Sequence, residues 1–234
     1  MTYVVAVIPA LNEAASIAAV VTETLEFVDH VIVIDDGSSD RTADLATAAG
    51  AAVMRHADNR GVGSAVASGL RAAREAGAEV VVQVDGDGQH DPAWIRPLTE
   101  RVQGGADLVV GTRFENGFEM GVIRRAILRG FAWTIARRIG VDITDPTSGF
   151  RAFSTQAADQ LTPVFPKKYL SDTVETLFIA HELGLKIETV PVVMHQRRGG
   201  EASVGVVHGV GYTLRMAAIV TRHGLHGMRS RRRA

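Results

Sequence analysis

The feature that most constrains the fold of this chain is an alternation of short apolar runs with helix-like segments. Residues 3–8 form a continuous apolar run, which is typical of a strand buried on both faces of a parallel sheet. Residues 16–27 follow with apolar side chains at helical spacing, and the alternation continues to about residue 110. Such a chain is expected to form an α/β fold, with a mainly parallel central sheet flanked by helices. Further strands are expected at residues 31–34, 51–54, 79–84 and 107–110, and further helices at residues 40–50, 63–76 and from Pro92 onward.

The pattern changes in the second half of the chain, where polar loops separate the apolar runs. Pro191 falls inside the last expected strand and predicts that this strand lies at an edge of the sheet, because proline has no backbone N–H to donate. The elements expected here are a polar loop at residues 112–121, helices at 124–139, 170–183 and 206–222, and strands at 150–153 and 186–194.

Composition excludes several other classes of protein. Hydrophobic residues make up 46% of the chain and charged residues 22%, which is enough apolar content for a packed core. The chain has no cysteine, so disulfide scaffolds, thiolate metal sites and cysteine nucleophiles are excluded. The first apolar run has no basic segment before it, and no window holds the ~20 apolar residues of a membrane-spanning helix. We therefore expect neither a signal peptide nor a spanning helix.

Acidic side chains follow three of the expected strands at the point where each strand ends. Ligands of open parallel sheets bind beyond the carboxyl ends of the strands, so these acids are expected to meet in one crevice. Carboxylates gathered in one place repel one another, and a bound cation would relieve that repulsion. The three clusters are Asn12-Glu13, Asp35-Asp36 and Asp85-Gly86-Asp87.

The segment from Asp85 to His90 is the strongest candidate for a cation site. Gly86 permits a tight bend that brings the carboxylates of Asp85 and Asp87 to one side. With the amide oxygen of Gln89 they form an all-oxygen ligand set suited to Mg²⁺ or Mn²⁺, with coordination positions left for phosphate. A solvated Asp-Gly turn is the alternative, but the apolar strand before it and the two other acidic strand ends favour the metal site.

A glycine-rich segment at residues 59–63 could let the backbone approach a ligand closely at the start of a helix, with Gly63 as the candidate contact. It lacks the Gly-Lys-Ser/Thr ending of a P-loop. Residues 9–13, the turn after the first strand, contain no glycine, which argues against a dinucleotide-binding dehydrogenase. Taken alone, residues 59–63 are better explained as an ordinary turn.

Arginines gather in or next to the loops of the second half. Because a guanidinium binds phosphate through two parallel hydrogen bonds, they are candidates for phosphate contacts. A solvated basic surface is the alternative for each of them. These arginines are Arg113, Arg124, Arg125, Arg197 and Arg198.

Six motifs, in this order, give the chain a resemblance to the family 2 glycosyltransferases of the GT-A fold. The similarity is greatest to the polyprenyl-phosphate branch, which resembles dolichyl-phosphate mannose synthase, and it extends to about residue 205. The motifs are Pro9-Ala-Leu-Asn-Glu13, Asp35-Asp-Gly-Ser-Ser-Asp40, Asn59-Arg-Gly-Val-Gly63, Asp85-Gly-Asp-Gly-Gln-His90, Asp107-Leu-Val-Val-Gly-Thr-Arg113 and Ser148-Gly-Phe-Arg151.

The resemblance implies roles for individual residues. The nucleotide would be held by Pro9, Ala10, Glu13 and Asp36 and by the segment that ends at Gly63, with the metal on Asp85, Asp87 and Gln89. The acceptor phosphate would meet Arg113 and one of Arg124 or Arg125, with Asp145 as the carboxylate near the acceptor. A late loop with Arg198 and Ser203 would close on the donor phosphates.

The chain departs from the family pattern in two places. The late loop usually reads Arg-x-x-Gly-x-Ser, and counted from Arg198 the glycine place holds Glu201. The branch has a serine after the pair at residues 124–125, and Leu128 stands there instead.

The implied activity is metal-dependent, inverting transfer of a hexose from GDP-mannose or a UDP-sugar to a polyprenyl phosphate. A phosphate acceptor is already ionised at neutral pH and needs no strong base, whereas a hydroxyl acceptor would need one. Two alternatives remain open. One is a family 2 enzyme acting on a hydroxyl of a saccharide or small molecule, and the other is a catalytically silent nucleotide-sugar-binding partner subunit. The intact Asp85 and Asp87 argue against the silent subunit.

The uneven charge of the chain bears on its location. The net charge is −1, but residues 202–234 hold six arginines and no acid, so the rest of the chain carries −7. A basic amphipathic helix and tail at residues 206–234 can lie on an anionic membrane surface, where each cationic side chain adds ~1 kcal/mol of electrostatic attraction. A helix packed on the domain, followed by a solvated tail, is the alternative.

We therefore expect one catalytic domain over residues 1–205, with a nucleotide-binding half at 1–111 and an acceptor half at 112–205. The enzyme is expected to be cytoplasmic and peripheral on the cytoplasmic face of the membrane, docked there directly or through a membrane partner subunit. No nucleic-acid binding is expected, because aromatic residues do not interleave the basic tail.

Overall fold

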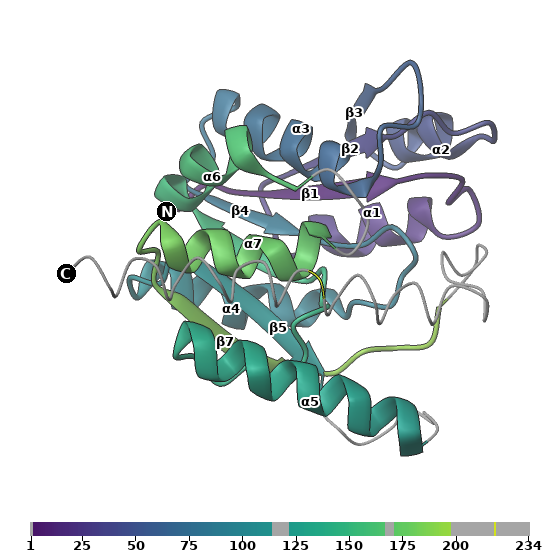
Figure 1. Ribbon diagram of the computed structural model, residues 1–234. Helices are drawn as coiled ribbons and strands as arrows, with labels where there is room; N and C mark the ends of the chain where they lie inside the picture. The colour runs from purple at the N-terminus through teal and green to yellow at the C-terminus, as the bar shows by residue number, and fades with distance from the viewer. Residues whose placement is uncertain (1, 114–121, 167–170, 198–217, 219–234) are drawn as a thin grey trace.

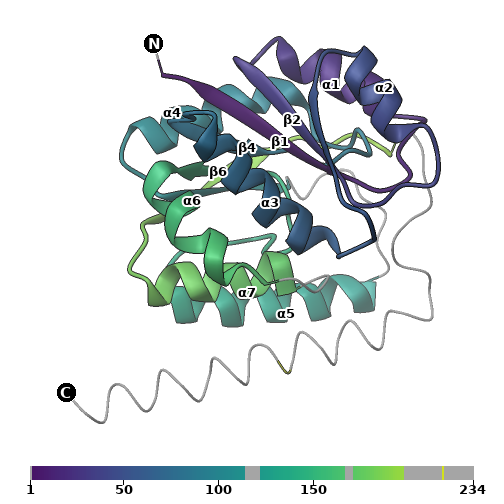
Figure 2. The ribbon, with the colours of Figure 1, turned by 90° about the horizontal axis from the view of Figure 1, so that it is seen from above.

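The computed structural model of this protein describes residues 2–113, 122–166, 171–197 and 218 (Figure 1). These residues form a seven-stranded sheet in the order β3-β2-β1-β4-β6-β5-β7, with helices packed on both faces (Figures 1 and 2). The mainly parallel α/β architecture expected from the sequence is confirmed. None of the helices in this described part of the chain is both long and apolar enough to cross a membrane.

The first half of the chain alternates strand and helix as the apolar pattern predicts. Its elements are β1 (Val4–Ala10), α1 (Ile17–Leu25), β2 (His30–Asp35), α2 (Thr42–Ala48), β3 (Ala52–Arg55), α3 (Val62–Glu75) and β4 (Val80–Gln83). The elements that follow are the 3₁₀ turn η1 (Pro92–Trp94), α4 (Ile95–Gln103), β5 (Leu108–Arg113), α5 (Val122–Ile139), β6 (Arg151–Ser154), α6 (Thr155–Leu161), the 3₁₀ turn η2 (Thr162–Val164), α7 (Ser171–Glu182) and β7 (Ile187–Val192).

β1 is the central strand of the parallel part of the sheet. It pairs with β2 on one side and with β4 on the other, and β3 extends the sheet beyond β2, all in parallel. β6 runs antiparallel between β4 and β5, with Gln83 opposite Arg151. The apolar run at residues 150–153 carried no information on this direction, because strand direction depends on which distant strand becomes the partner.

β1 is buried along its whole length, because helices cover both faces of the sheet. Val5 and Val7 pack in the layer that contains α3, α5, α6 and α7. Ala6 and Ile8 pack in the opposite layer, with α1, α2 and α4 (Figure 2). A fully buried valine or isoleucine contributes ~1.5–3 kcal/mol relative to an exposed one, so both faces select apolar residues. This double layer explains why the strand is continuously apolar rather than alternating.

The second half differs from the sequence prediction in its details. β5 continues to Arg113, three residues beyond the predicted end, because it stays paired with β7 as far as Val192. α6 was not predicted, and it begins at Thr155, directly after Ser154, whose hydroxyl accepts a hydrogen bond from the backbone N–H of Ala157 in the first turn. The edge position predicted from Pro191 is confirmed, since β7 is the last strand of the sheet. Except for residue 218, the helix expected at 206–222 lies outside the described residues.

Candidate functional site

The order of the strands defines a crevice at one edge of the sheet. The chain runs from β1 to β2 and β3 on one side and then returns to β4 on the other side of β1. In open sheets, ligands bind at the carboxyl ends of the strands that flank such a reversal. Glu13 follows β1, and Asp85 and Asp87 follow β4, so the predicted acids of these two strands lie at the same edge. We call this the acidic edge.

Asp87 is buried at the acidic edge and is paired with Arg197, which follows β7. One carboxylate oxygen, Oδ2, accepts hydrogen bonds from Nη2 and Nε of Arg197 at 2.9 and 3.2 Å. The other, Oδ1, accepts one from the backbone N–H of Gln89 at 3.0 Å. The side chain of Asp87 is 7% exposed, and an unpaired carboxylate with so little contact with water would be costly. Arg197 therefore supplies positive charge to the acidic edge.

Glu13 shares this electrostatic environment. Burial raises the pKa of its carboxyl above the ordinary 4.5. A hydrogen bond from Ser16 and the charge of Arg197 lower the pKa, while the carboxylates of Asp87 and Asp85 raise it. The Ser16 hydroxyl lies 3.1 Å from Oε2 of Glu13 and 2.7 Å from a carbonyl oxygen of the turn after β4. The turns after β1 and β4 are thus joined by both charge and hydrogen bonding.

Asp85 is held between a histidine and a glycine. Its backbone N–H donates to Nδ1 of His90 at 3.0 Å, and Nε2 of the same ring lies 3.4 Å from its Oδ2. The buried imidazole stacks on Phe150, with ring centroids 4.6 Å apart and an interplanar angle of 11°. On the other side Gly149 approaches so closely that an added Cβ would lie 2.6 Å from Oδ1 of Asp85. The carboxylate is therefore confined by its surroundings.

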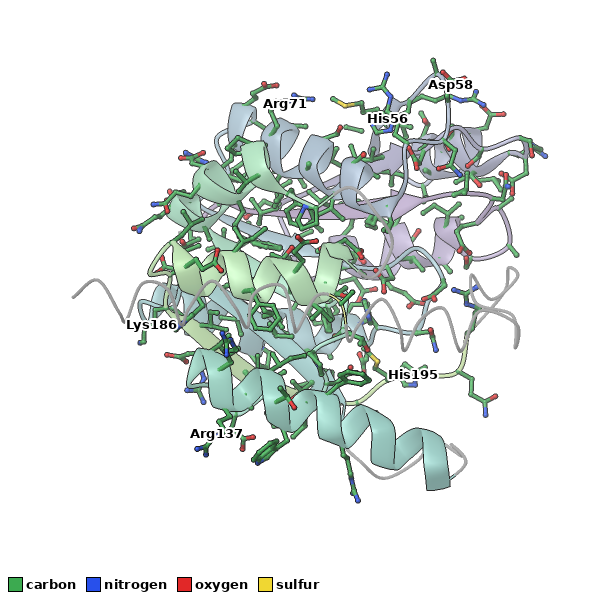
Figure 3. All side chains as sticks on the ribbon, in the orientation of Figure 1. His56, Asp58, Arg71, Arg137, Lys186 and His195 are labelled. Atoms are coloured by element: carbon green, nitrogen blue, oxygen red, sulfur yellow. The ribbon has the colours of Figure 1, made fainter. Side chains whose placement is uncertain are left out.

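Asp85, Asp87 and Gln89 are the residues predicted to hold a divalent cation. In the described part of the chain, no group of three or more His, Asp or Glu side chains is arranged to hold a metal ion. The two carboxylates still suit Mg²⁺ or Mn²⁺, because they are hard oxygen donors and the Asp85 side chain is 37% exposed. Gln89 is partly exposed, and its backbone carbonyl accepts a hydrogen bond from the backbone N–H of His195, labelled in Figure 3, at 2.8 Å. These residues fit a cation that arrives with a ligand supplying further oxygens.

The acids after β2 have different partners. The backbone N–H of Asp36 donates to the carbonyl of Ala10 at 2.9 Å, so Asp36 lies beside the end of β1. Its carboxylate accepts hydrogen bonds from the backbone N–H groups of Arg60 and Gly61 at 3.0 and 2.7 Å, and lies 2.6 Å from Nδ1 of His56. The predicted meeting of three acidic strand ends is therefore partial. The ends of β1 and β4 share one environment, whereas the Asp36 carboxylate is bound to the loop after β3.

The glycine-rich loop packs tightly on the turn after β2. Gly37 has a φ of +81°, and an added Cβ there would lie 2.9 Å from the backbone nitrogen of Asn59. Beside it, the fully buried Asp35 lies 3.1 Å from Nε of Arg55 through its Oδ2. Gly63 is buried in the first turn of α3. The loop is therefore packed against the turn after β2.

Most of the other residues predicted to contact the nucleotide or the acceptor lie at the ends of strands and helices. Pro9 and Ala10 end β1, Arg113 ends β5, and Arg124 and Arg125 lie in the first turn of α5. Arg198 and Ser203 lie outside the described residues. The carboxylate of Asp145 accepts hydrogen bonds from the backbone N–H and the hydroxyl of Thr147 at 3.1 and 2.6 Å, so it is engaged within its own turn.

Arg151, at the start of β6, is a buried cation to which the sequence assigned no role. Burial lowers its pKa to about 10, against the raising effect of three nearby carboxylates, so it remains charged at neutral pH. Its guanidinium holds the chain segment that lies against Asp85 to the start of α7. The acceptors are the backbone carbonyls of Ser148 and Thr173, both at 2.9 Å, and of Pro146 at 3.4 Å. An arginine inside an apolar strand was the signal that could have identified it.

Arg197 could have been recognised from the late-loop pattern. Counted from Arg197 instead of Arg198, the pattern Arg-x-x-Gly-x-Ser places Gly200 at the glycine and Ala202 at the serine. Of these two arginines, Arg197 is the one among the described residues, and it binds Asp87. A one-residue shift in the pattern thus selects Arg197, the arginine observed to bind Asp87.

The fold is that of the GT-A glycosyltransferases. Solved structures of glucosyl-3-phosphoglycerate synthase from Mycobacterium tuberculosis share the fold. One of them, in complex with Mn²⁺, uridine-diphosphate and phosphoglyceric acid, matches with a TM-score of 0.75 at 24% sequence identity, covering 95% of this chain and 78% of that chain.

The chain belongs to glycosyl transferase family 2, whose model matches residues 5–162. It is 32% identical to undecaprenyl-phosphate mannosyltransferase of Micrococcus luteus, over 97% of this chain and 98% of the relative. It is 30% identical to polyprenol monophosphomannose synthase of Mycolicibacterium smegmatis, over 97% and 89% of the two chains. The protein is therefore a glycosyltransferase, and the resemblance to the polyprenyl-phosphate mannose synthase branch is confirmed.

Proposed function

We propose that this protein transfers a hexose from a nucleotide-diphosphate sugar to a polyprenyl phosphate, with inversion at the anomeric carbon. The observation that carries the proposal is the acidic edge, where Glu13, Asp85 and Asp87 meet Arg197 at the strand reversal. The names of the similar polyprenyl-phosphate and polyprenol mannosyltransferases support the lipid phosphate as the acceptor. The donor is GDP-mannose or a UDP-sugar.

In this proposal Asp85, Asp87 and Gln89 hold Mg²⁺ or Mn²⁺ on the diphosphate of the donor. The cation supplies charge neutralisation for the nucleoside diphosphate leaving group. Pro9, Ala10, Glu13 and Asp36 hold the base and ribose, and Glu13 is the one of these four that also belongs to the acidic edge. Asp36 accepts three hydrogen bonds from the chain itself, so its carboxylate retains about one of its four acceptor positions for a ribose hydroxyl.

Arginines bind the acceptor phosphate in this proposal. Arg113, at the end of β5, and Arg124 or Arg125, at the start of α5, come from adjoining elements of the acceptor half. A phosphate oxygen forms the new bond to C1 of the sugar, and the bond from C1 to the diphosphate oxygen breaks. An α-linked donor thus gives a β-linked product. Because the attacking phosphate is already ionised, Asp145 is not required to remove a proton from it.

The remaining parts of the proposal concern segments outside the described residues. Arg198 and Ser203 contact the donor phosphates together with Arg197, and residues 206–234 dock the catalytic domain of residues 1–205 on the cytoplasmic face of the membrane. The six arginines after residue 201 support docking to an anionic surface. Sedimentation with phosphatidylglycerol vesicles tests this part, and the full chain is expected to pellet with these vesicles but not with phosphatidylcholine vesicles.

The activity is tested by incubating the protein with Mn²⁺, membrane lipid and radiolabelled GDP-mannose or UDP-sugars. Label is expected to enter the organic phase with one of these donors, and the donor that labels the lipid identifies the nucleotide. Label that stays in aqueous saccharide would overturn the lipid acceptor and favour a hydroxyl acceptor. Absence of any transfer with preserved nucleotide binding would instead favour a catalytically silent subunit.

A further inference from the structure

Three buried side chains form a hydrogen-bonded row beside the acidic edge. Nδ1 of His56 lies 2.6 Å from Oδ1 of Asp36, and Nε2 of the same ring lies 3.0 Å from Oγ of Ser68. The exposed fractions of Asp36, His56 and Ser68 are 3%, 5% and 8%. Because an ionised carboxylate only accepts hydrogen bonds, Nδ1 carries the proton that faces Asp36, and Nε2 lies within hydrogen-bond distance of the Ser68 hydroxyl. Every polar atom of the imidazole is therefore engaged.

The row fixes more than one side chain, because Asp36 also holds a loop. The Asp36 carboxylate accepts from the backbone N–H groups of Arg60 and Gly61, the last residues before α3. His56 provides the shortest contact to this carboxylate and is itself tied to β2, since its backbone N–H donates to the carbonyl of Asp35 at 2.9 Å. Without the imidazole, the carboxylate could rotate and the loop would lose its fixed acceptors.

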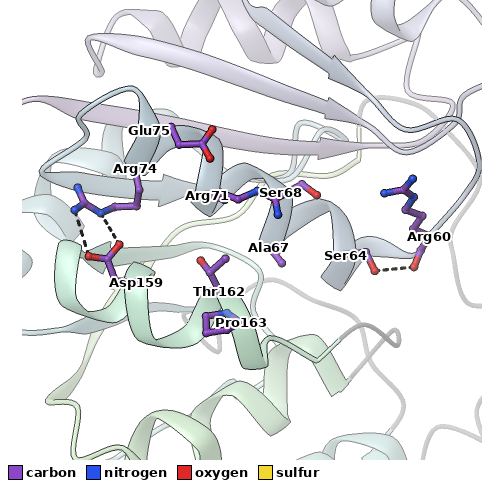
Figure 4. Close-up of a pocket in the computed structure, with 10 residues that line it drawn as sticks. All are labelled: Arg60, Ser64, Ala67, Ser68, Arg71, Arg74, Glu75, Asp159, Thr162 and Pro163. Atoms are coloured by element: carbon purple, nitrogen blue, oxygen red, sulfur yellow. Dashed lines mark hydrogen bonds and ion pairs between the residues drawn. The ribbon is translucent and has the colours of Figure 1, made fainter.

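The far end of the row reaches the wall of a groove between α3 and the segment formed by α6 and η2 (Figure 4). This groove has a volume of about 780 Å³, and Ser68 lines it together with Arg60, Ser64, Arg71, Arg74 and Thr162. Arg74 is already paired with Asp159 there, at 2.9 Å. Asp36 is the end of the row that lies toward the proposed nucleotide-sugar site, because the backbone N–H of Asp36 donates to the carbonyl of Ala10 at the end of β1.

We propose that His56 is a positioning residue of the donor site. It holds the Asp36 carboxylate, and through it the Arg60–Gly61 backbone, in the arrangement that binds a nucleoside diphosphate. Figure 3 shows His56 beside the start of α3, away from the metal-holding turn after β4, so its effect falls on the nucleotide rather than on the cation. The inference rests on the proposed function, which places the base and ribose beside Asp36.

Three substitutions separate the two hydrogen bonds of the ring. His56→Phe keeps the ring shape and removes both bonds, so the dissociation constant for the nucleoside diphosphate is expected to rise ~10-fold, as for a lost hydrogen bond to a charged group. His56→Gln can still donate to Asp36, and a rise of ~3-fold is expected. Ser68→Ala removes only the far bond, and a rise of ~2-fold is expected. His181→Phe, on the exposed surface of α7, is the matched control and should bind as the wild type does.

The test is a calorimetric titration of each folded variant with GDP and with UDP in the presence of Mn²⁺, with circular dichroism as the check of folding. Amide hydrogen exchange at Arg60 and Gly61 is the second readout, and it should accelerate ~10-fold in His56→Phe while the amides of β1 stay protected. In the transfer assay the KM for the donor should rise with kcat within ~3-fold, which a general loss of folded protein would not produce.

The outcomes distinguish the inference from the proposed function. If the wild type binds neither nucleotide, the proposed function is wrong. If the wild type binds one of them and folded His56→Phe binds it equally well, the positioning role is overturned. If His56→Phe does not fold, His56→Gln and Ser68→Ala decide the matter, and wild-type affinity together with wild-type exchange at Arg60 and Gly61 in both variants overturns the role.

Discussion

The turn after β2 and the turns that form the acidic edge, after β1 and β4, have similar acidic sequences, but their carboxylates have different partners. After β2, the Asp36 carboxylate binds two backbone N–H groups and His56 of its own chain. At the acidic edge, Asp87 binds the side chain of Arg197, and Glu13 lies close enough to Asp85 and Asp87 for their charges to raise its pKa. The first arrangement holds the loop that leads into α3.

The difference is in the partners: the Asp36 carboxylate is held mainly by backbone N–H groups and a histidine, whereas the acidic edge gathers several carboxylates beside an arginine side chain. Backbone donors are fixed to their acceptor by the fold, so the Asp36 cluster stabilises the protein as it stands. Like charges gathered at the acidic edge destabilise the protein and are offset in part by Arg197 and Arg151, so a bound divalent cation would stabilise this region more than the turn after β2. An acidic turn after a strand is therefore informative only together with its partners.

The largest expected effect comes from removing Asp87. The substitution Asp87→Ala should reduce metal-dependent release of nucleoside diphosphate by on the order of 10³-fold, because it removes one of the two carboxylates proposed to hold the cation. Asp159→Ala removes a surface carboxylate that pairs with Arg74 and should change turnover by less than ~2-fold. Turnover of Asp87→Ala equal to that of the control would remove the metal assignment.

Gly149→Ala tests the confinement of Asp85 without deleting a charge. The added Cβ would lie 2.6 Å from Oδ1 of Asp85 and must displace that carboxylate. We expect the affinity for Mn²⁺ in the presence of nucleotide to fall ~10- to 100-fold. Gly130→Ala is the matched control, because a Cβ at that position in α5 meets no atom within 4 Å. Equal Mn²⁺ affinity in both variants would show that Asp85 is free to move.

The free energies of unfolding of two variants, one from the turn after β2 and one from the acidic edge, test the difference between these regions directly. Asp36→Asn should lower the free energy of unfolding by ~1.5–3 kcal/mol, since it weakens three hydrogen bonds to a buried charge. Asp85→Asn should change it by less than ~0.5 kcal/mol, because that side chain is 37% exposed and lies among like charges. Urea unfolding in EDTA measures both. A cost for Asp85→Asn as large as that for Asp36→Asn would remove the distinction between the two regions.

The smallest expected effect is the pH dependence contributed by Glu13. Because burial raises the pKa of Glu13 above 4.5, its contribution to stability is complete below pH 4.5 and is lost as the pH rises through the folded-state pKa. Glu13→Gln cannot titrate at this position, so the wild type should lose stability relative to this variant as the pH rises from 4.5 through the folded-state pKa of Glu13. Metal-free unfolding over this range checks the sign, and a difference that runs the other way contradicts the raised pKa.

The parallel half of the fold was predictable because its signals are local. Continuous apolar runs mark strands buried on both faces, and β1 to β4 follow those runs within a few residues. The direction of β6 was not predictable, because it depends on pairing with β4 and β5 across more than forty residues of chain.

In the site, too, residues close together in the sequence could be predicted, whereas contacts between distant segments could not. The carboxylates of Asp85 and Asp87 were found from their spacing within one turn. Their partners were not, because Arg197 is separated from Asp87 by 110 residues and Gly149 comes from the segment before β6. For Asp36 the sequence predicted the right edge of the sheet, but the loop that occupies its carboxylate follows a different strand.

Binding of a divalent cation at the acidic edge, together with the donor, is the central requirement of the proposed function. Electron paramagnetic resonance of free Mn²⁺ measures this directly in the presence of GDP or UDP. Wild-type protein and Asp159→Asn should remove the free Mn²⁺ signal at equal concentrations of protein and metal, whereas Asp87→Ala should leave most of it. A signal reduced to the same extent by Asp87→Ala and by the wild type would contradict the claim.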